Sequence, residues 1–179
     1  MTHGTEEKIM DAALNEFAEK GYDGARTKDI AERSGLSEMT LFRRFKSKKN
    51  LFNQVIIKAK EDAIRDINLT LKNQNTNSED YFKNITVQFW DLTEKYLQFL
   101  SIIIIERNKL SEDLIAELIN YLIKIFEKNF PDSEVNPRVF IFSMLSFMFL
   151  SALDKSRGRN ILDHRNDFES FMDYSIKCL

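Results

Sequence analysis

Residues 27–45 read "TKDIAERSGLSEMTLFRRF", and this stretch predicts two short helices joined by a tight turn. Thr27 is expected to cap the first helix, and Gly35 to end it, because glycine tolerates the left-handed conformation found at helix ends. Ser37 has the spacing of a cap for the second helix, and Ala31 supplies the small side chain needed where two helices cross closely. The stretch therefore predicts a helix-turn-helix.

Apolar residues at helical spacing extend on both sides of this motif. Ile9, Ala13 and Phe17 recur every four residues on an expected helix that opens at Thr5 and ends at Gly21. Further helices are expected from the cap Ser47 to about Lys72, and near residues 79–100, 101–109, 111–130, 137–156 and 165–178. With only five glycines and two prolines in 179 residues, the composition favours long helices over many short strands.

Residues 99–105 have the composition of a strand, but a single strand among helices would have no partner for its backbone hydrogen bonds. We therefore expect a helix there, and an all-α protein of about nine helices. The expected division is a three-helix, helix-turn-helix head at residues 1–50 and a helical body at residues 51–179. A chain of this length can bury a sizeable core.

The sequence also indicates a compartment. Cys178 is the only cysteine, so an intrachain disulfide is excluded, as suits a reducing cytoplasm. Residues 1–7 lack the basic and then apolar pattern of a signal peptide. The apolar stretch 139–153 has 15 residues, three of them serine, whereas a membrane span needs about 20. We expect a cytoplasmic protein without a membrane contact.

Charge is distributed unevenly along the chain. The net charge is −2, which by itself argues against a nucleic-acid partner. Residues 26–49, however, contain eight basic and three acidic side chains, a local charge of +5 that leaves −7 for the remainder. A basic segment on an otherwise acidic chain is typical of a DNA-binding head, although a charge cluster can also be an ordinary solvated surface.

The second helix of the motif has two distinct faces. Leu41 and Phe45 lie four residues apart and are expected to face the core. Met39 and Arg43 lie two residues to either side of Leu41, about 200° around the helix, and are expected to point outward. An exposed arginine on such a helix can bind the O6 and N7 atoms of guanine in the major groove.

Residues 9–52, "IMDAALNEFAEKGYDGARTKDIAERSGLSEMTLFRRFKSKKNLF", closely resemble the N-terminal domain of the TetR (tetracycline repressor) family of transcriptional regulators. The matching features include the Phe-Ala-x-Lys-Gly-Tyr turn that begins at Phe17, the Gly-Leu-Ser turn at residues 35–37, and the Phe-Lys-Ser-Lys run at residues 45–48. The rest of the chain agrees with the family only in length and helical content.

The resemblance implies DNA contacts from the two motif helices and from the start of the next helix. The expected DNA-binding residues are Thr27, Lys28, Ser37, Met39, Thr40, Phe42, Arg43, Arg44 and Lys48. Two positions depart from the family. Phe42 replaces the usual tyrosine, so contact with a sugar or a thymine methyl replaces a phosphate hydrogen bond, and Arg44 adds a charge where histidine or tyrosine is common. For Thr27 and Ser37 a purely capping role is the alternative, and for Arg44 and Lys48 simple solvation.

Motifs for other chemistry are not found in the sequence. His3 and His164 lie far apart, and neither has cysteine or carboxylate neighbours at metal-ligand spacing. There is no glycine-rich phosphate loop and no Gly-x-Ser-x-Gly elbow. We therefore expect no enzyme activity, no cofactor and no bound metal.

The body is rich in aromatic residues at helical spacing, which ordinarily form a core. The family resemblance implies a cavity for a small inducing ligand among these helices, with apolar walls and a few polar groups. Tyrosine and tryptophan combine an aromatic ring with a polar atom, which suits such a wall. The expected ligand-binding residues are Phe89, Trp90, Tyr96 and Tyr121.

The last two helices are expected to form a dimer interface. Residues 139–153 are apolar almost all round, and the last helix is apolar on one side, as a symmetric four-helix contact requires. The family commonly dimerises through its last two helices. The expected interface residues are Phe147, Phe168, Phe171, Met172 and Ile176. The alternative is a large monomer core.

Together these features predict a dimeric repressor that binds a pseudo-palindromic operator in double-stranded DNA and is released by a small apolar or amphipathic effector. One alternative is a DNA-binding regulator of the same fold that answers to a partner protein. Another is an all-helical binding module that has lost DNA binding. Salt-dependent binding to DNA separates the last from the others, and a ligand-dependent melting shift identifies the first.

Overall fold

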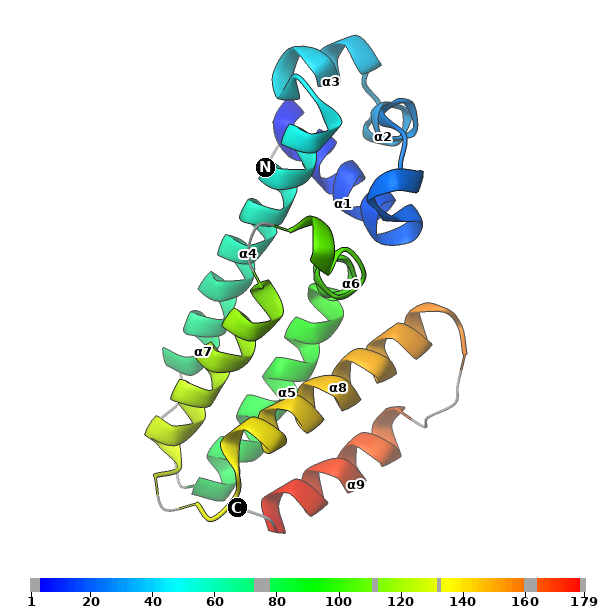
Figure 1. Cartoon of the computed structure of the whole chain (residues 1–179). Helices are drawn as coiled ribbons and strands as arrows, with labels where there is room; N and C mark the ends of the chain where they lie inside the picture. Colours follow the sequence, from blue (N-terminus) through cyan, green and yellow to red (C-terminus); the bar gives the residue numbers. More distant parts are fainter. Residues whose placement is uncertain (1–3, 73–77, 111–112, 132, 160–163, 178–179) are drawn as a thin grey trace. The chain divides into compact units, whose positions relative to one another are not determined.

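The computed structural model describes residues 4–72, 78–110, 113–131, 133–159 and 164–177, and over these ranges the chain is helical with no strand (Figure 1). The helices are α1 (Thr5–Gly24), α2 (Thr27–Ser34), α3 (Glu38–Phe45), α4 (Lys48–Lys72), α5 (Ser78–Lys95), α6 (Leu97–Ile105), the 3-10 helix η1 (Arg107–Lys109), α7 (Leu114–Asn129), α8 (Pro137–Ser156) and α9 (His164–Lys177). The all-α prediction is confirmed, including a helix where residues 99–105 have strand propensity.

Packing divides the chain into two compact units. The head unit comprises residues 1–65 and 98–110, and the body unit comprises residues 66–97 and 111–179. Most of α6 thus packs with the head unit although it is distant in sequence. The expected functional division at residue 50 remains a prediction, because these units are defined by packing alone.

The head unit is built around α1, which packs on α2, while α2 packs on α3. Phe17 of α1 and Phe52 of α4 are both buried, and their rings meet edge to face with centroids 5.0 Å apart. Ile30 of α2 and Leu41 of α3 are fully buried in the same unit. These contacts fix the angle at which α3 is presented, because apolar burial is the main stabilising contribution in so small a unit.

Two of three expected helix caps are confirmed. Ser37 accepts a hydrogen bond from the Thr40 amide at 3.2 Å, and Ser47 accepts one from the Asn50 amide at 3.1 Å. The expectation for Thr27 is wrong. Arg26 occupies the cap position of α2, and Thr27 is its first helical residue. The Thr27 hydroxyl caps no backbone amide of α2 and instead donates a hydrogen bond to Glu38 of α3.

Glycine ends two helical segments in the head unit. Gly21 has a φ of 69°, and the α1 axis kinks there before a last turn that reaches Gly24. The regular part of α1 therefore ends at Gly21 as expected, and one further helical turn follows it. Gly35 has a φ of 71° and caps α2 in the left-handed conformation, as predicted.

Two boundaries in the second half of the chain differ from expectation. Helix α5 ends at Lys95 and α6 begins at Leu97, several residues before the expected break after residue 100. Helix α7 begins at Leu114, where Asp113 accepts a hydrogen bond from the Ala116 amide at 3.2 Å. The expected start at residue 111 lies outside the described residues.

The body unit packs α8 against both α5 and α7, and α9 against α5 (Figure 1). Its buried cluster includes Ile67, Phe89, Leu122, Phe126 and Met148. Within the described part of the chain, α8 alone is long and apolar enough to span a membrane by length and composition. Core helices of globular proteins meet the same two criteria, and α8 makes core contacts on one face.

Candidate nucleic-acid interface

Helix α3 presents one face to solvent and the other to the core, as its sequence predicts. Leu41 and Phe45 are buried, whereas Met39 is 81% exposed, Phe42 is 41% exposed, and Arg43 is exposed between them. An exposed methionine and phenylalanine on so short a helix are unfavourable in water. Beside a cation, they suit contact with the apolar and polar edges of bases in a major groove.

Several cations of the basic segment are occupied within the head unit. Arg26 donates two 3.0 Å hydrogen bonds to Asp29, which also accepts one from Lys20. The hydrogen bond from Arg26, followed by that from Lys20, lowers the pKa of Asp29. Arg33 binds Glu19 through two nitrogens at 2.8 and 2.9 Å and lowers the pKa of that carboxyl in the same way. These pairs stabilise the α1–α2 contact.

Arg43 differs from these cations. Its guanidinium has no hydrogen-bond or ion-pair partner among the described residues, and only its backbone carbonyl accepts a bond, from Lys46 at 3.0 Å. An uncommitted guanidinium loses no internal bond when it turns toward a base. Among the residues of α3, Arg43 is therefore the one best suited to bind a DNA base.

Four other expected DNA-binding residues lie on α3, at its cap or on α2. Arg44 lies 3.3 Å from Glu6, and Lys28 lies 3.9 Å from Glu32, two exposed and exchangeable pairs. The Ser37 and Thr40 hydroxyls are 2.9 Å apart.

The ends of α2, α3 and α4 bring the remaining two residues into this unit. The Thr27 hydroxyl donates to Glu38 Oε1 at 2.5 Å, a link between α2 and α3 that the sequence did not indicate. Lys48 donates to the Asp23 carbonyl at 3.3 Å, and its ammonium lies 4.8 Å from the centre of the Tyr22 ring. Lys48 is therefore held in place at the start of α4.

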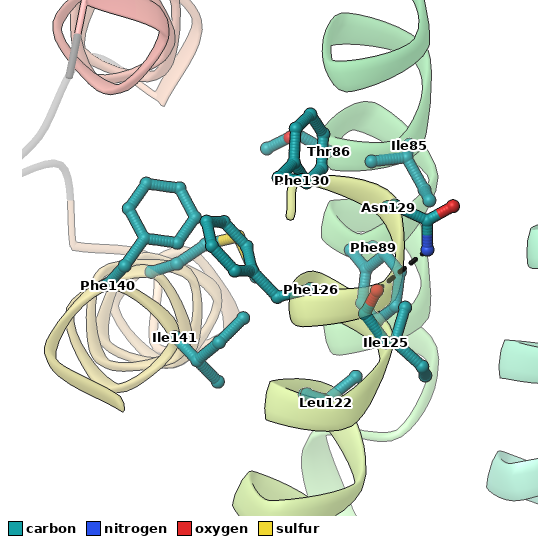
Figure 2. A pocket seen from close by; sticks show the side chains of 11 residues that line it. Ile85, Thr86, Phe89, Leu122, Ile125, Phe126, Asn129, Phe130, Phe140 and Ile141 are labelled. Carbon is teal, nitrogen blue, oxygen red and sulfur yellow. Dashed lines mark hydrogen bonds between the residues drawn. The ribbon is translucent and has the colours of Figure 1, made fainter. Parts of the chain in front are cut away.

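The body unit contains a small cavity of about 40 Å³ (Figure 2). It is lined by Ile85, Thr86, Phe89, Leu122, Ile125, Phe126, Asn129, Phe130, Phe140, Ile141 and Met144, from α5, α7 and α8. The wall is almost entirely apolar, and Asn129 donates its side-chain amide to the Ile125 carbonyl at 2.7 Å.

Of the four expected ligand-binding residues, Phe89 lines this cavity. Trp90 points elsewhere: its ring lies 4.5 Å from that of Phe168, and its indole nitrogen donates to Glu94 at 3.1 Å. The other two make polar links inside the body unit. Tyr96 donates to Asp66 at 2.6 Å, and Tyr121 donates to Asn68 at 2.6 Å.

The expected dimer residues pack partly within the chain. Phe147 of α8 stacks on Phe171 of α9 with ring centroids 4.4 Å apart, and Phe168 packs on Trp90. The side chains of Met172 and Ile176 lie outside the described residues.

The opposite face of α8 is open and mainly apolar, with Ser143 also exposed on it. Val139, Phe142 and Leu150 are 62%, 58% and 60% exposed, while Ile141 and Met148 face the core. In the sequence, only the apolar composition of residues 139–153 on all sides indicated that such a face could exist. It could not indicate which side the rest of the chain covers.

Comparisons with known proteins agree with this geometry. Residues 9–55 match the family described as "Bacterial regulatory proteins, tetR family". The chain is 32% identical over 93 residues to IcaR of Staphylococcus aureus, the negative transcriptional regulator of the icaADBC biofilm operon. That match covers 51% of this chain and 50% of IcaR, so the chain spans about half the length of such curated relatives.

Solved structures extend the likeness to the whole fold. The fatty acid degradation regulator FadR of Bacillus halodurans superposes with a TM-score of 0.69 at 16% identity, over 98% of this chain and 96% of that one. AibR, solved with isovaleryl coenzyme A and operator DNA, gives 0.64 at 16% identity, over 82% and 84%. Residues 9–55 therefore match the TetR family of bacterial regulators, which are transcriptional regulators and not enzymes, and the fold of the chain is similar to that of solved regulators.

Proposed function

We propose that this protein is a cytoplasmic, dimeric transcriptional repressor that binds operator DNA through α3 and is released by a small apolar or amphipathic effector. The observation that carries the proposal is the outer face of α3. Met39, Phe42 and the unpaired Arg43 are exposed there above a firmly buried Leu41 and Phe45. The description of IcaR as a negative regulator supports repression.

The proposed DNA contacts fall into two classes. Arg43 reads a guanine, while Met39 and Phe42 touch thymine methyls or sugars. The remaining residues bind phosphates and fix the register of α3 on the duplex, and they are Thr27, Lys28, Ser37, Thr40, Arg44 and Lys48. Thr27 would exchange its bond to Glu38 for a phosphate contact.

The proposed dimer interface centres on the open face of α8. Val139, Phe142 and Leu150 would be covered by the same helix of a second copy, as a two-fold interface requires. Phe147, Phe168 and Phe171 would support that face from within the chain. Two heads would then read two half-sites of a pseudo-palindrome.

The proposed effector site is the cavity between α5, α7 and α8. Its volume of about 40 Å³ holds only a few water-sized groups, so an effector would displace side chains such as Phe130, Phe140 or Met144. The apolar wall favours an aliphatic group. The isovaleryl coenzyme A ligand of AibR makes short acyl compounds the first candidates to test.

Selection from a library of randomised DNA duplexes tests this function. The purified protein should enrich a pseudo-palindrome with half-sites about one or more helical turns apart, and binding should weaken as salt rises. Absence of any enriched sequence at low salt would contradict DNA binding. A selected operator that no small apolar compound releases would instead favour control by a partner protein.

A further inference from the structure

The kink of α1 is held by side chains that follow α6 in the head unit. Glu106 Oε1 accepts a hydrogen bond from the Tyr22 amide at 2.8 Å, and the Glu106 side chain is only 11% exposed. A Cβ atom at Gly21 would lie 2.6 Å from the same oxygen, so the glycine makes room for the carboxylate. Lys109 adds ion pairs to Asp23 and, at 3.4 Å, to Glu106.

The segment held in this way contacts Lys48 twice. The Lys48 ammonium lies over the Tyr22 ring and donates to the Asp23 carbonyl. The Tyr22 ring is itself held in place, because it packs against the Phe52 ring with centroids 5.0 Å apart. The position of Lys48 therefore depends on the Tyr22–Asp23 backbone, and that backbone depends on Glu106.

We propose that Glu106 is a positioning residue for DNA binding, which fixes the Tyr22–Asp23 segment and so holds Lys48 ready for a DNA phosphate. The proposal rests on the proposed DNA-binding function. An ordered lysine loses less side-chain entropy on binding than a freely rotating one. Releasing Lys48 should therefore weaken DNA binding about three- to tenfold.

Two substitutions separate the hydrogen bond of Glu106 from its charge. Glu106→Asp keeps the charge but shortens the side chain, so the carboxylate no longer reaches the Tyr22 amide. Glu106→Gln keeps the length and an acceptor oxygen but removes the charge. Loss of a negative charge alone would strengthen binding to DNA. We expect the aspartate variant to bind about three- to tenfold more weakly, and the glutamine variant to bind at least as tightly as the wild type.

The experiment uses the full chain and a fluorescein-labelled, random-sequence DNA duplex at low salt, because a phosphate contact carries no base information. Glu106→Asp is measured alone and in a Lys48→Ala background, with circular dichroism as a check of folding. If Glu106 acts through Lys48, the aspartate substitution should change affinity less than about twofold in the Lys48→Ala background. Glu61→Asp, at an exposed position of α4, is the matched control and should have no effect.

The outcomes are distinct. Equal losses in both backgrounds would assign Glu106 a general structural role and overturn the proposal, as would an unchanged affinity of Glu106→Asp. Should Glu106→Asp fail to fold, Gly21→Ala displaces the carboxylate instead and must show the same dependence on Lys48. If the wild-type protein binds no duplex, the proposed DNA-binding function itself fails, and the inference with it.

Discussion

The head unit and the body unit expose different kinds of side chain at their surfaces. In the head unit, the outward residues of α3 include the unpaired Arg43, whereas Arg26 and Arg33 of the same unit are held in ion pairs. In the body unit, the outward residues of α8 include Val139, Phe142 and Leu150, a mainly apolar row in which Ser143 is also exposed. A charged face suits a polyanion, whereas an apolar row suits another protein surface.

The interiors differ as well. Leu41, Leu51 and Phe45 of the head unit are almost completely buried, whereas the body unit leaves a cavity beside Phe126 and Phe140. The closely packed head holds α3 through buried side chains, and the cavity in the body is the proposed place for an effector. The comparison predicts that substitutions in the two units affect separate properties.

Loss of the dimer should be the largest effect. Phe142→Asp would place an unpaired carboxylate in the proposed interface, at a cost of about 3–5 kcal/mol. We expect a folded monomer by light scattering at micromolar concentration, with operator affinity reduced at least about a hundredfold. Phe171→Asp is the comparison, because Phe171 packs on Phe147 inside the chain and its loss should unfold the body. A wild-type monomer at the same concentration would contradict the two-headed mechanism.

Removal of the base-reading side chain should have the next largest effect. Arg43→Ala should cost about 1–3 kcal/mol on the selected operator and relax selectivity at one base pair of each half-site. The oligomeric state should not change, because the residue lies in the head unit. Binding measured across a randomised operator library decides the matter, and unchanged selectivity would exclude Arg43 from base reading.

Removal of a phosphate contact should act more weakly and without regard to sequence. Lys48→Ala should lower the slope of log affinity against log salt by about one unit per head, hence about two per dimer. Affinity should fall about equally on operator and random DNA. A loss confined to the operator would show that Lys48 does not bind the backbone.

Filling the cavity should leave DNA binding almost unchanged and remove the response to an effector. Ile125→Trp enlarges a half-buried residue of the cavity wall, at an expected stability cost of about 1–3 kcal/mol. Acyl coenzyme A compounds that release the wild-type protein from its operator should then fail to release the variant. Release from a labelled operator is measured for both proteins, and undiminished release of the variant would exclude this cavity.

The helix-turn-helix and the faces of α3 could be predicted from sequence because they depend on neighbouring residues. Helical periodicity alone places Leu41 and Phe45 on one side and Met39 and Arg43 on the other. Gly35 and Ser37 act within a few residues of their own positions, so their roles can also be predicted from the local sequence. The same reasoning failed for Thr27, whose hydroxyl binds Glu38 of the next helix.

The body unit shows the limit of such reasoning. Periodicity indicated that residues 139–153 are apolar all round, but it could not tell which side the chain itself would cover. Packing places Phe147 against α9 and leaves Phe142 open. The aromatic residues with polar atoms suggested a ligand wall, yet Tyr96, just after α5, and Tyr121 of α7 use those atoms to bind residues of α4.

The sequence by itself determined the helical class, the motif, its outward arginine and the likeness to a family of regulators, since each depends on spacing along one short segment. Only the tertiary structure decided that Glu106 binds the amide of Tyr22, 84 residues away. It also decided which apolar face of α8 stays open. These features depend on which distant segments pack together, and that choice follows from burial summed over a whole unit and not from any local pattern.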